Sequence, residues 1–241
     1  MKIEGKNPVR EIINSSTDIK RVILEKGNPN ALLKEIEDIC AKKHIKVQYM
    51  EKKDLDKLSE TGHHQGVIAE CPDFEYASLD KLIKNCKDEG KDMLFIILDE
   101  VLDPHNLGSI IRVAECAGAT GVIISNRRSA SVNETVVRTS AGATAYLPVV
   151  RVTNINQVIE QLKNENVWVY ALDMDGEEMY KTNLTGNVAL VVGGEGNGVS
   201  RLTRKLCDGV ISIPMFGQVN SLNASVSAGI ATYEVIRQRR K

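Results

Sequence analysis

The sequence lacks the paired cysteines that zinc sites and disulfide frameworks need. Its cysteines are spaced singly, without any Cys-x-x-Cys pair: Cys40, Cys71, Cys86, Cys116 and Cys207. We therefore expect no metal site, and a protein of the reducing cytoplasm. No apolar run is long enough to cross a bilayer, and the charged residues that follow Met1 do not form a signal peptide. The sequence thus predicts a cytoplasmic protein that does not contact membranes.

An excess of positive charge is also absent, because 31 Lys and Arg residues face 32 Asp and Glu residues and leave a formal net charge of −1. Proteins that bind phosphate non-specifically are usually basic, so contact with nucleic acid would have to rest on local groups. The candidates are Lys42, Lys43 and Lys46, then Arg127 and Arg128, then Arg237, Arg239, Arg240 and Lys241. Taken alone, each group is more typical of a solvated face or of a helix C-terminus.

The first 72 residues have the pattern of a small α/β domain. Asn7 and Pro8 are typical of an N-cap and a first helical residue, and Asn30 can cap a second helix. The expected elements are helices at 9–13, 31–43 and 55–58 and strands at 21–24, 47–50 and 66–70. We expect residues 73–91 to form a linker and a leading helix, and residues 92–241 to form a second domain.

The sequence of the second domain has a strongly α/β pattern. Its apolar runs are 94–98, 122–125, 145–150, 167–172, 188–192 and 210–213, with helical patterns between most of them and a long last helix at 222–239. Strands that are apolar throughout, rather than alternating, indicate burial on both faces, as in a parallel sheet. Ligands of such sheets gather at the carboxyl ends of the strands, so the polar segments there are the candidates for chemistry.

The first such segment covers residues 98–115. A strand ends, a loop with Pro104 turns, and a helix starts near Asn106, which would be its N-cap. Arg112 and Glu115 are three residues apart on this helix, and spacing alone favours a surface ion pair. The apolar neighbours of Arg112 instead favour a buried arginine, which needs a partner or an anionic ligand.

The second segment, residues 191–200, is rich in glycine. It lacks the Gly-Lys-Ser/Thr of a Walker A loop, and its glycine spacing does not match the dinucleotide fingerprint Gly-x-Gly-x-x-Gly. Glu195 would also put a negative charge where a phosphate would bind. One carboxylate on a glycine-rich turn suits a ligand with a cation or with amine and hydroxyl donors, such as S-adenosylmethionine. A tight strand–helix turn without a ligand is an equally good interpretation of this segment alone.

The third segment, residues 211–225, is broken by Pro214 and Gly217 before Ser221 or Asn223 begins the last helix. The backbone of such a loop can hydrogen-bond an adenine edge while apolar side chains, here Ile213 and Leu222, cover the faces of the ring. Simple capping by Ser221 or Asn223 is the alternative.

Together the three segments resemble the signature motifs of the SpoU/TrmH family, a branch of the SPOUT methyltransferases. The matching residues occur in order: Asp103-Pro104-x-Asn106-x-Gly108 with Arg112, Gly194-Glu195-Gly196-x-Gly198, and Ile213-Pro214-Met215-x-Gly217-x-Val219-x-Ser221-Leu222-Asn223. The resemblance covers residues 92–241. It departs from other members at Gly193 and Gly194, where they carry different small residues before the glutamate, and we expect little effect.

The resemblance implies an S-adenosylmethionine-dependent 2′-O-methyltransferase of structured RNA, with a trefoil-knotted catalytic domain that forms a homodimer. The leading domain is similar to the ribosomal-protein-like RNA-binding domain of many members. Its Gly5-Lys6-Asn7-Pro8-Val9 start and its His64-Gln65-Gly66-Val67 strand resemble the subgroup that methylates a guanosine ribose of large-subunit ribosomal RNA. Transfer RNA as substrate, a non-catalytic RNA-binding protein, and a nucleotide-dependent oxidoreductase or kinase are the alternatives.

The resemblance also implies the roles of individual residues. The expected catalytic residues are Arg112, Asn106, Glu195, Ser221 and Asn223, and the expected cofactor-binding residues are Gly193, Gly194, Gly196, Ile213 and Leu222. Arg112 would polarise the 2′-oxygen and hold the adjacent phosphate, because a guanidinium is rarely neutral and makes a poor base.

Overall fold

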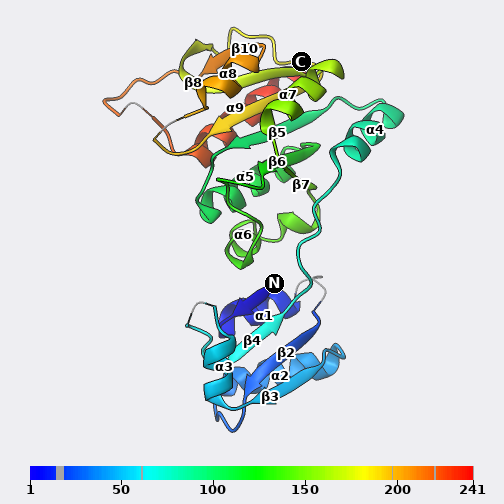
Figure 1. Ribbon diagram of the computed structural model, residues 1–241, viewed down its shortest axis with the longest axis vertical. Helices are drawn as coiled ribbons and strands as arrows, with labels where there is room; N and C mark the ends of the chain where they lie inside the picture. The colour runs from blue at the N-terminus through cyan, green and yellow to red at the C-terminus, as the bar shows by residue number, and fades with distance from the viewer. Residues whose placement is uncertain (15–18, 61, 197, 220, 241) are drawn as a thin grey trace. The chain divides into compact units, whose positions relative to one another are not determined.

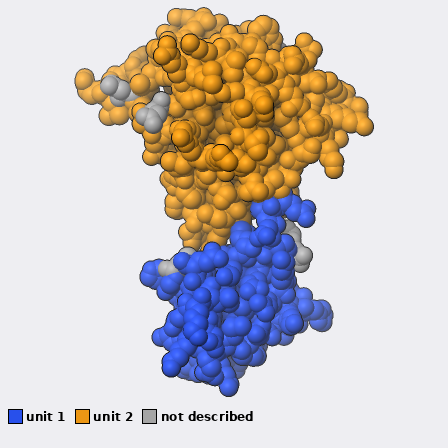
Figure 2. Space-filling model, in the orientation of Figure 1, with its two compact units in different colours: residues 1–75 blue, residues 76–241 orange. Residues whose placement is uncertain are grey.

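The computed structural model describes residues 1–14, 19–60, 62–196, 198–219 and 221–240. It divides into two compact units, residues 1–75 and 76–241 (Figure 2). The sequence-based division was at residue 72, inside the same linker. Among the described residues, no helix is both long enough and apolar enough to cross a membrane.

The front unit is a four-stranded sheet in the order β1-β4-β2-β3, covered by helices (Figure 1). Strands β2 and β3 are parallel, while β4 runs antiparallel to both β1 and β2. The strands are β1 (Lys2–Glu4), β2 (Arg21–Glu25), β3 (Val47–Met50) and β4 (Val67–Glu70), and the helices are α1 (Lys6–Asn14), α2 (Ala31–Lys42) and α3 (Lys52–Leu58). Leu55 of α3 packs against Ile23 and Ile68 on one face of this sheet.

The sequence analysis missed one strand of the front unit and misplaced one helix cap. Strand β1 was not expected, because an edge strand of three residues is too short to show a periodic pattern. Asn7 is not an N-cap, since α1 already begins at Lys6, directly after Gly5 turns the chain at φ +93°. The expected cap of α2 is confirmed, because the side chain of Asn30 accepts a hydrogen bond from the backbone N–H of Leu32.

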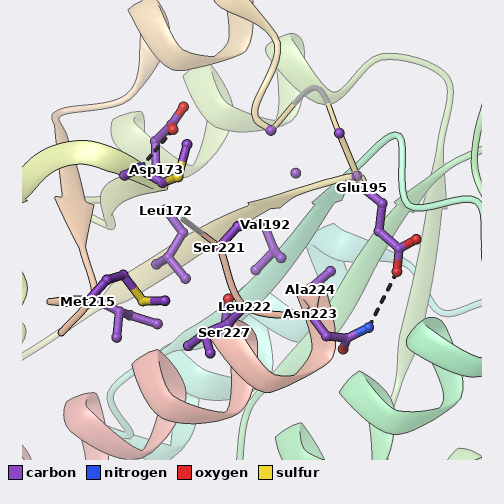
Figure 3. Close-up of a pocket in the computed structure, with 16 residues that line it drawn as sticks. Leu172, Asp173, Val192, Glu195, Met215, Ser221, Leu222, Asn223, Ala224 and Ser227 are labelled. Carbon is purple, nitrogen blue, oxygen red and sulfur yellow. Dashed lines mark hydrogen bonds between the residues drawn. The ribbon is translucent and has the colours of Figure 1, made fainter. Parts of the chain in front are cut away.

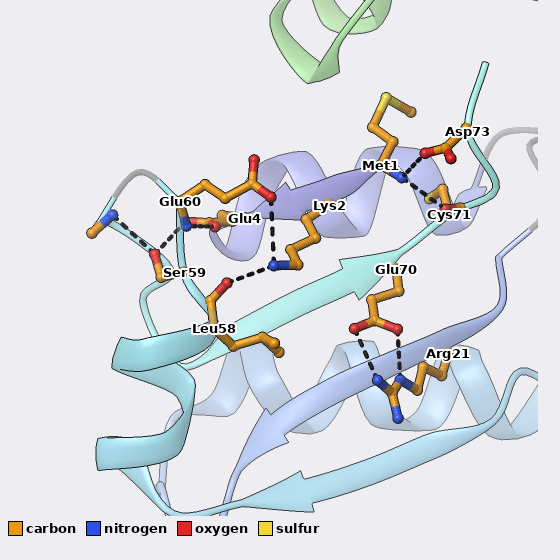
Figure 4. A network of polar contacts seen from close by, with 11 residues as sticks. Met1, Lys2, Glu4, Arg21, Leu58, Ser59, Glu60, Glu70, Cys71 and Asp73 are labelled. Atoms are coloured by element: carbon orange, nitrogen blue, oxygen red, sulfur yellow. Dashed lines mark hydrogen bonds and ion pairs between the residues drawn. The ribbon is translucent and has the colours of Figure 1, made fainter.

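A bidentate ion pair joins the two central strands of the front unit (Figure 4). Arg21 donates from Nε to Glu70 Oε2 at 2.7 Å and from a terminal nitrogen to Glu70 Oε1 at 2.9 Å. The hydrogen bond from Arg21, together with the charge of that arginine, lowers the pKa of Glu70 below its usual value. The side chains are 34% and 21% exposed, so solvent screens the pair only in part.

We expect Glu70→Gln to destabilise the front unit by about 1 kcal/mol near neutral pH. Because the pKa of Glu70 is lowered in the folded state, this loss should be complete above the ordinary glutamate pKa of about 4.3 and should vanish as the pH falls through the lowered value. Amide hydrogen exchange of β2 and β4, corrected for intrinsic rates, measures it. Glu51→Gln is the control, since the Glu51–Lys26 pair is 68% and 69% exposed; an equal loss there, or a loss independent of pH, would contradict the assignment.

The second unit contains a six-stranded sheet in the order β10-β8-β9-β5-β6-β7, and every neighbouring pair is parallel. The predicted parallel sheet is thus confirmed. The strands are β5 (Leu94–Asp99), β6 (Gly121–Ser125), β7 (Val149–Val152), β8 (Trp168–Glu178), β9 (Val188–Gly193) and β10 (Gly209–Ser212). The strand expected at 145–150 was wrong in its first half. Pro148 has no N–H for a sheet hydrogen bond, and residues before it form a short 3-10 turn, Ala143–Ala145, of which only Ala143 is buried.

Helices cover both faces of this sheet (Figure 1). One face packs against α4 (Leu79–Glu89), α7 (Ile155–Asn164) and α8 (Arg201–Leu206). The other carries α5 (Pro104–Cys116) and α9 (Ala224–Arg239), which contact each other, and α6 (Glu134–Thr139) packs on α5. A Cβ on Gly229 would lie 3.5 Å from the side chain of Val113 in α5, an ordinary van der Waals distance, so the packing of α9 on α5 does not require this glycine.

Part of the basic tail is used inside the second unit. Arg237 pairs with Glu234 at 2.7 Å, and Arg239 donates to the backbone oxygens of Met93 and Gly186 at 2.7 and 2.6 Å. Burial lowers the pKa of Arg239. Arg239 therefore holds α9 against the chain before β5 and β9, whereas the pair of Arg237 lies within α9 itself. Lys241, the last member of the predicted group, lies outside the described residues.

Candidate active site

A cavity of about 410 Å³ lies at the carboxyl ends of β9 and β10, beside the middle of β8 (Figure 3). We call it the main pocket. Three chain segments form its walls, and its lining residues are Leu172, Asp173, Met174, Val192, Gly193, Gly194, Glu195, Gly196, Gly198, Ile213, Met215, Ser221, Leu222, Asn223, Ala224 and Ser227. The volume is within the range of sites for small molecules and cofactors. Its position follows the rule that ligands of open α/β sheets bind at the carboxyl ends of strands.

The glycine-rich loop needs its glycines because the backbone passes very close to other backbone. A Cβ on Gly193 would lie 2.0 Å from the carbonyl carbon of Gly198, and a Cβ on Gly194 would lie 2.2 Å from the carbonyl oxygen of Glu100. The N–H of Gly194 also donates to the carbonyl oxygen of Asp99 at 2.8 Å. The loop is therefore pressed against the end of β5, and this fixes where Glu195 starts.

Asn106, Glu195 and Asn223 form a polar cluster that joins the three predicted segments. Asn106 is 4% exposed and donates from Nδ2 to Glu195 Oε1 at 2.6 Å. Asn223 donates from Nδ2 to Asn106 Oδ1 at 2.9 Å and to Glu195 Oε1 at 3.3 Å. Within the described chain, the other carboxylate oxygen of Glu195 accepts no hydrogen bond, so it is available to a ligand.

The cluster corrects the predicted role of Asn106 as a helix cap. Helix α5 begins at Pro104, and the side chain of Asp103 caps it by accepting a hydrogen bond from the N–H of His105 at 2.9 Å. Asn106 lies in the first helical turn, where its side chain is free to reach Glu195. Of the two candidates for the cap of α9, the cap is Asn223, which accepts from the N–H of Ser225 at 2.9 Å.

The predicted burial of Arg112 was wrong. Arg112 is exposed on α5 and does not line the main pocket. It makes no hydrogen bond or ion pair with any described residue, so the expected pair with Glu115 is absent as well. The physical reason is that successive helical residues are about 100° apart, so Ile110 and Ile111 can be buried while the next side chain faces outward.

The structure brings most of the predicted site residues to one place. The residues that line the main pocket are Gly193, Gly194, Glu195, Gly196, Ile213, Ser221, Leu222 and Asn223. Asn106 lies outside the lining and reaches it through Glu195. Arg112 is the one predicted residue that is neither in the pocket nor bonded to the cluster.

Comparison with known families decides what kind of site this is. Residues 93–233 match the model of the SpoU rRNA Methylase family, and residues 2–77 match the model described as RNA 2′-O ribose methyltransferase substrate binding. The chain belongs to the SpoU methylase family. This SpoU-family chain is therefore an RNA methyltransferase rather than a kinase or an oxidoreductase, and the family uses S-adenosylmethionine as methyl donor.

Relatives of this SpoU-family chain agree with that membership. It is 41% identical over 237 residues to the TrmH family tRNA/rRNA methyltransferase YacO of Bacillus subtilis, covering 98% of the chain and 94% of YacO. It is 41% identical over 239 residues to the 23S rRNA (guanosine-2′-O-)-methyltransferase RlmB of Xanthomonas campestris, covering 98% and 96%. The solved structure of the SpoU methyltransferase AviRb from Streptomyces viridochromogenes in complex with AdoMet has a TM-score of 0.76 and 26% identity, covering 100% of this chain and 91% of AviRb. The resemblance drawn from the three motifs is confirmed.

The main pocket fits the chemistry of the family's methyl donor. Apolar side chains that can cover an adenine come from three strands or strand ends, with Leu172, Val192 and Ile213 among them. Carboxylates that can attract a sulfonium come from two of the walls. In the described part of the SpoU-family chain, no group of His, Cys, Asp and Glu could hold a metal ion.

Sequence reasoning missed one charged residue of the pocket. Asp173 lines the main pocket at the end of the apolar run 167–172, in β8. It pairs with Arg204 of α8, whose guanidinium nitrogen lies 3.2 Å from Asp173 Oδ2. The signal was present, because the rule about carboxyl ends of strands applies to this run too. Asp173 has no part in the three motifs that directed the prediction.

Proposed function

We propose that this SpoU-family enzyme transfers the methyl group of S-adenosylmethionine to the 2′-hydroxyl of a guanosine ribose in large-subunit ribosomal RNA. The observation that carries the proposal is the cluster of Asn106, Glu195 and Asn223. It holds Glu195 by one carboxylate oxygen and leaves the other oxygen available to a ligand at the edge of a cofactor-sized pocket. The ribosomal substrate is supported by the 41% identity to RlmB over both units. It is also supported by the match of residues 2–77 to a substrate-binding family.

The donor would be held by the glycine-rich loop and the third segment. Gly193, Gly194 and Gly196 offer backbone that a ligand can approach closely, while Ile213 and Leu222 offer apolar surface for the adenine. When bound, S-adenosylmethionine supplies an electrophilic methyl group whose leaving group is a neutral thioether. The protein must then align the 2′-oxygen and help to remove its proton.

Arg112 would polarise the 2′-oxygen and hold the neighbouring phosphate of the substrate. A guanidinium keeps its proton, so the phosphate itself is the better proton acceptor. Asn106, Glu195, Ser221 and Asn223 would orient the ribose and the donor. The free oxygen of Glu195 is suited to accept a hydrogen bond from a ribose hydroxyl or from the amino group of the donor.

A homodimer would bring the exposed Arg112 to a pocket. Arg112 lies on α5, and apolar side chains are exposed nearby in sequence and on the adjacent helix α9, among them Leu102 at 66% and Val226 at 48%. Exposed apolar side chains of this kind are typical of surfaces that pair with a second molecule. Analytical ultracentrifugation should give twice the chain mass, and a monomer at micromolar concentration would contradict this arrangement.

Two finer features of the fold follow from the same proposal. We infer that the second unit is threaded as a trefoil knot, in which the segment before α9 passes under the glycine-rich loop. The convergence of Ile213, Ser221 and Leu222 on the pocket that residues 192–196 also line supports this threading. We also infer that the front unit is a ribosomal-protein-like RNA-binding domain.

Mapping 2′-O-methylation in RNA from cells with and without the gene tests the proposed substrate. Loss of one methylated guanosine from large-subunit ribosomal RNA, restored by the wild-type gene, is the expected result. Loss of a methyl group from a transfer RNA instead would favour the alternative substrate. Calorimetry with S-adenosylmethionine is the parallel test of the active site, because a protein that only binds RNA should not bind the donor.

A further inference from the structure

The charged side chains of the main pocket are all of one sign. Among the described residues that line it, the charged ones are Asp173 and Glu195, and there is no lysine or arginine. They come from different segments and lie on opposite sides of the cavity (Figure 3). The pocket is therefore built for a ligand that carries positive charge.

The two carboxylates have different partners. Glu195 receives its hydrogen bonds from neutral amides, those of Asn106 and Asn223, within the polar cluster. Among the described residues Asp173 makes no hydrogen bond with that cluster and is held by Arg204 instead, with its side chain 21% exposed. Its other oxygen, Oδ1, accepts the N–H of Met174 at 2.8 Å. Asp173 is thus an oriented carboxylate. It takes no part in the polar cluster that is proposed to orient the ribose and the donor.

Arg204 fixes Asp173 without cancelling its charge. One guanidinium nitrogen of Arg204 lies 3.2 Å from Asp173, and the other lies 2.7 Å from Asp175 Oδ1. The pairing lowers the pKa of Asp175 and raises that of Arg204. One cation is shared between two carboxylates, so the three groups together keep one negative charge. Of the three, only Asp173 lines the pocket.

We propose that Asp173 makes the pocket select the charged methyl donor over its neutral product. The inference rests on the proposed function. In the reaction the methyl group moves from sulfur to the 2′-oxygen, the sulfur keeps the electron pair of the broken bond, and the hydroxyl proton passes to the neighbouring phosphate of the RNA. The sulfonium of S-adenosylmethionine thereby becomes the uncharged thioether of S-adenosylhomocysteine. The attraction of Asp173 for the charge at sulfur ends at that step, so the product binds less tightly than the donor and is replaced by it.

The test is calorimetry on the full chain with three ligands that share the adenosyl and amino-acid groups. S-adenosylmethionine and sinefungin carry a cation at the reacting position, and S-adenosylhomocysteine does not. Asp173→Asn should weaken the two cationic ligands about 5- to 10-fold, as expected for one charge several ångströms away at intermediate dielectric. Affinity for S-adenosylhomocysteine should change by less than about two-fold, because the neutral thioether gains little from that charge.

Asp175→Asn is the matched control. It removes the other carboxylate of the same arginine, but its side chain is 67% exposed and lies outside the pocket, so it should lower the ratio of the affinities for donor and product clearly less than Asp173→Asn does. Asp173→Glu keeps the charge and should retain most of the preference for cationic ligands. Steady-state kinetics should show a higher KM for the donor in Asp173→Asn without a lower kcat, because the charge acts on the bound donor before transfer.

Several results would overturn the proposal. An equal loss of affinity for all three ligands would mean that Asp173 hydrogen-bonds a group they share, such as the ribose diol. An unchanged ratio of the affinities for donor and product in Asp173→Asn would also contradict the proposed role of Asp173. So would an equal change of that ratio in Asp175→Asn. If Asp173→Asn does not fold, the wild-type ratio must fall with added salt, and a ratio independent of salt would sink the idea. Absence of any binding to the wild-type protein would be different, since it would refute the proposed function itself.

Discussion

Replacing Arg112 with alanine is expected to lower the rate of methyl transfer by about 10²- to 10³-fold, the usual cost of losing one donor aimed at the reacting oxygen. The affinity for S-adenosylmethionine should stay within about two-fold of wild type, because Arg112 is assigned to the 2′-oxygen and phosphate of the RNA and not to the donor. Single-turnover transfer of a labelled methyl group and calorimetry measure the two effects separately. Arg112→Lys should recover only part of the rate, since an ammonium lacks the planar fork that can hold oxygen and phosphate together.

The matched control is Arg201→Ala, which removes an exposed arginine at the start of α8 in the same unit. Its transfer rate should remain near wild type. Equal losses in the two variants would reduce Arg112 to a general contribution to RNA affinity, which salt titration would reveal. Full activity in Arg112→Ala would refute the assigned role, and loss of donor binding would move Arg112 from chemistry to cofactor binding.

Mixing two inactive chains tells whether Arg112 acts within its own chain or on its partner. A chain with Arg112→Ala keeps its pocket, and a chain with Gly194→Ala keeps its arginine. If Arg112 reaches the pocket of the partner subunit, the mixed dimer contains one complete site and activity returns. If it acts on its own chain, both sites of the mixed dimer lack one component and activity stays absent. We expect recovery, because one chain alone leaves Arg112 exposed and without a described partner.

The parallel sheet and the pocket could be predicted because they depend on local patterns. Buried parallel strands are apolar throughout, and their carboxyl ends meet at one edge, so residues as distant as Ile213 and Gly193 were expected at one site. The glycines were expected too, since close backbone approach leaves a direct mark in the sequence. Such features need no knowledge of which side chain faces which neighbour.

The missed features depend on direction in space rather than on pattern. Whether Arg112 is buried is decided by the rotation of α5 against the sheet and α9, and its neighbours in sequence do not report that rotation. Asn106 was assigned to capping because asparagine favours caps, but Asp103 took that position and freed Asn106 for Glu195. Asp173 was passed over because no motif includes it, although it directly follows the apolar run 167–172; in the structure β8 continues past it to Glu178. These residues require the packed structure.

Gly194→Ala is expected to reduce the affinity for S-adenosylmethionine by more than about 100-fold and to destabilise the second unit by about 1–3 kcal/mol, as overpacking usually does. The new Cβ would lie 2.2 Å from the carbonyl oxygen of Glu100 and 2.9 Å from its carbonyl carbon. Backbone cannot move aside as the end of a flexible side chain can. Glu100 is itself held at φ +59°, a conformation that residues with a side chain rarely adopt, so it has little freedom to adjust. The loop must therefore lift away from the end of β5.

Lifting the loop would break the hydrogen bond from Gly194 to Asp99 and move Glu195 away from Asn106, so the pocket wall and the polar cluster fail together. Gly229→Ala is the matched control, because a Cβ there would meet nothing nearer than 3.5 Å and alanine favours the interior of α9. Calorimetry of donor binding and urea unfolding should leave Gly229→Ala at or above wild-type stability with full affinity. Wild-type donor affinity in Gly194→Ala would mean that the donor does not use this loop, and the assignment of the main pocket would then be wrong even if the family is right.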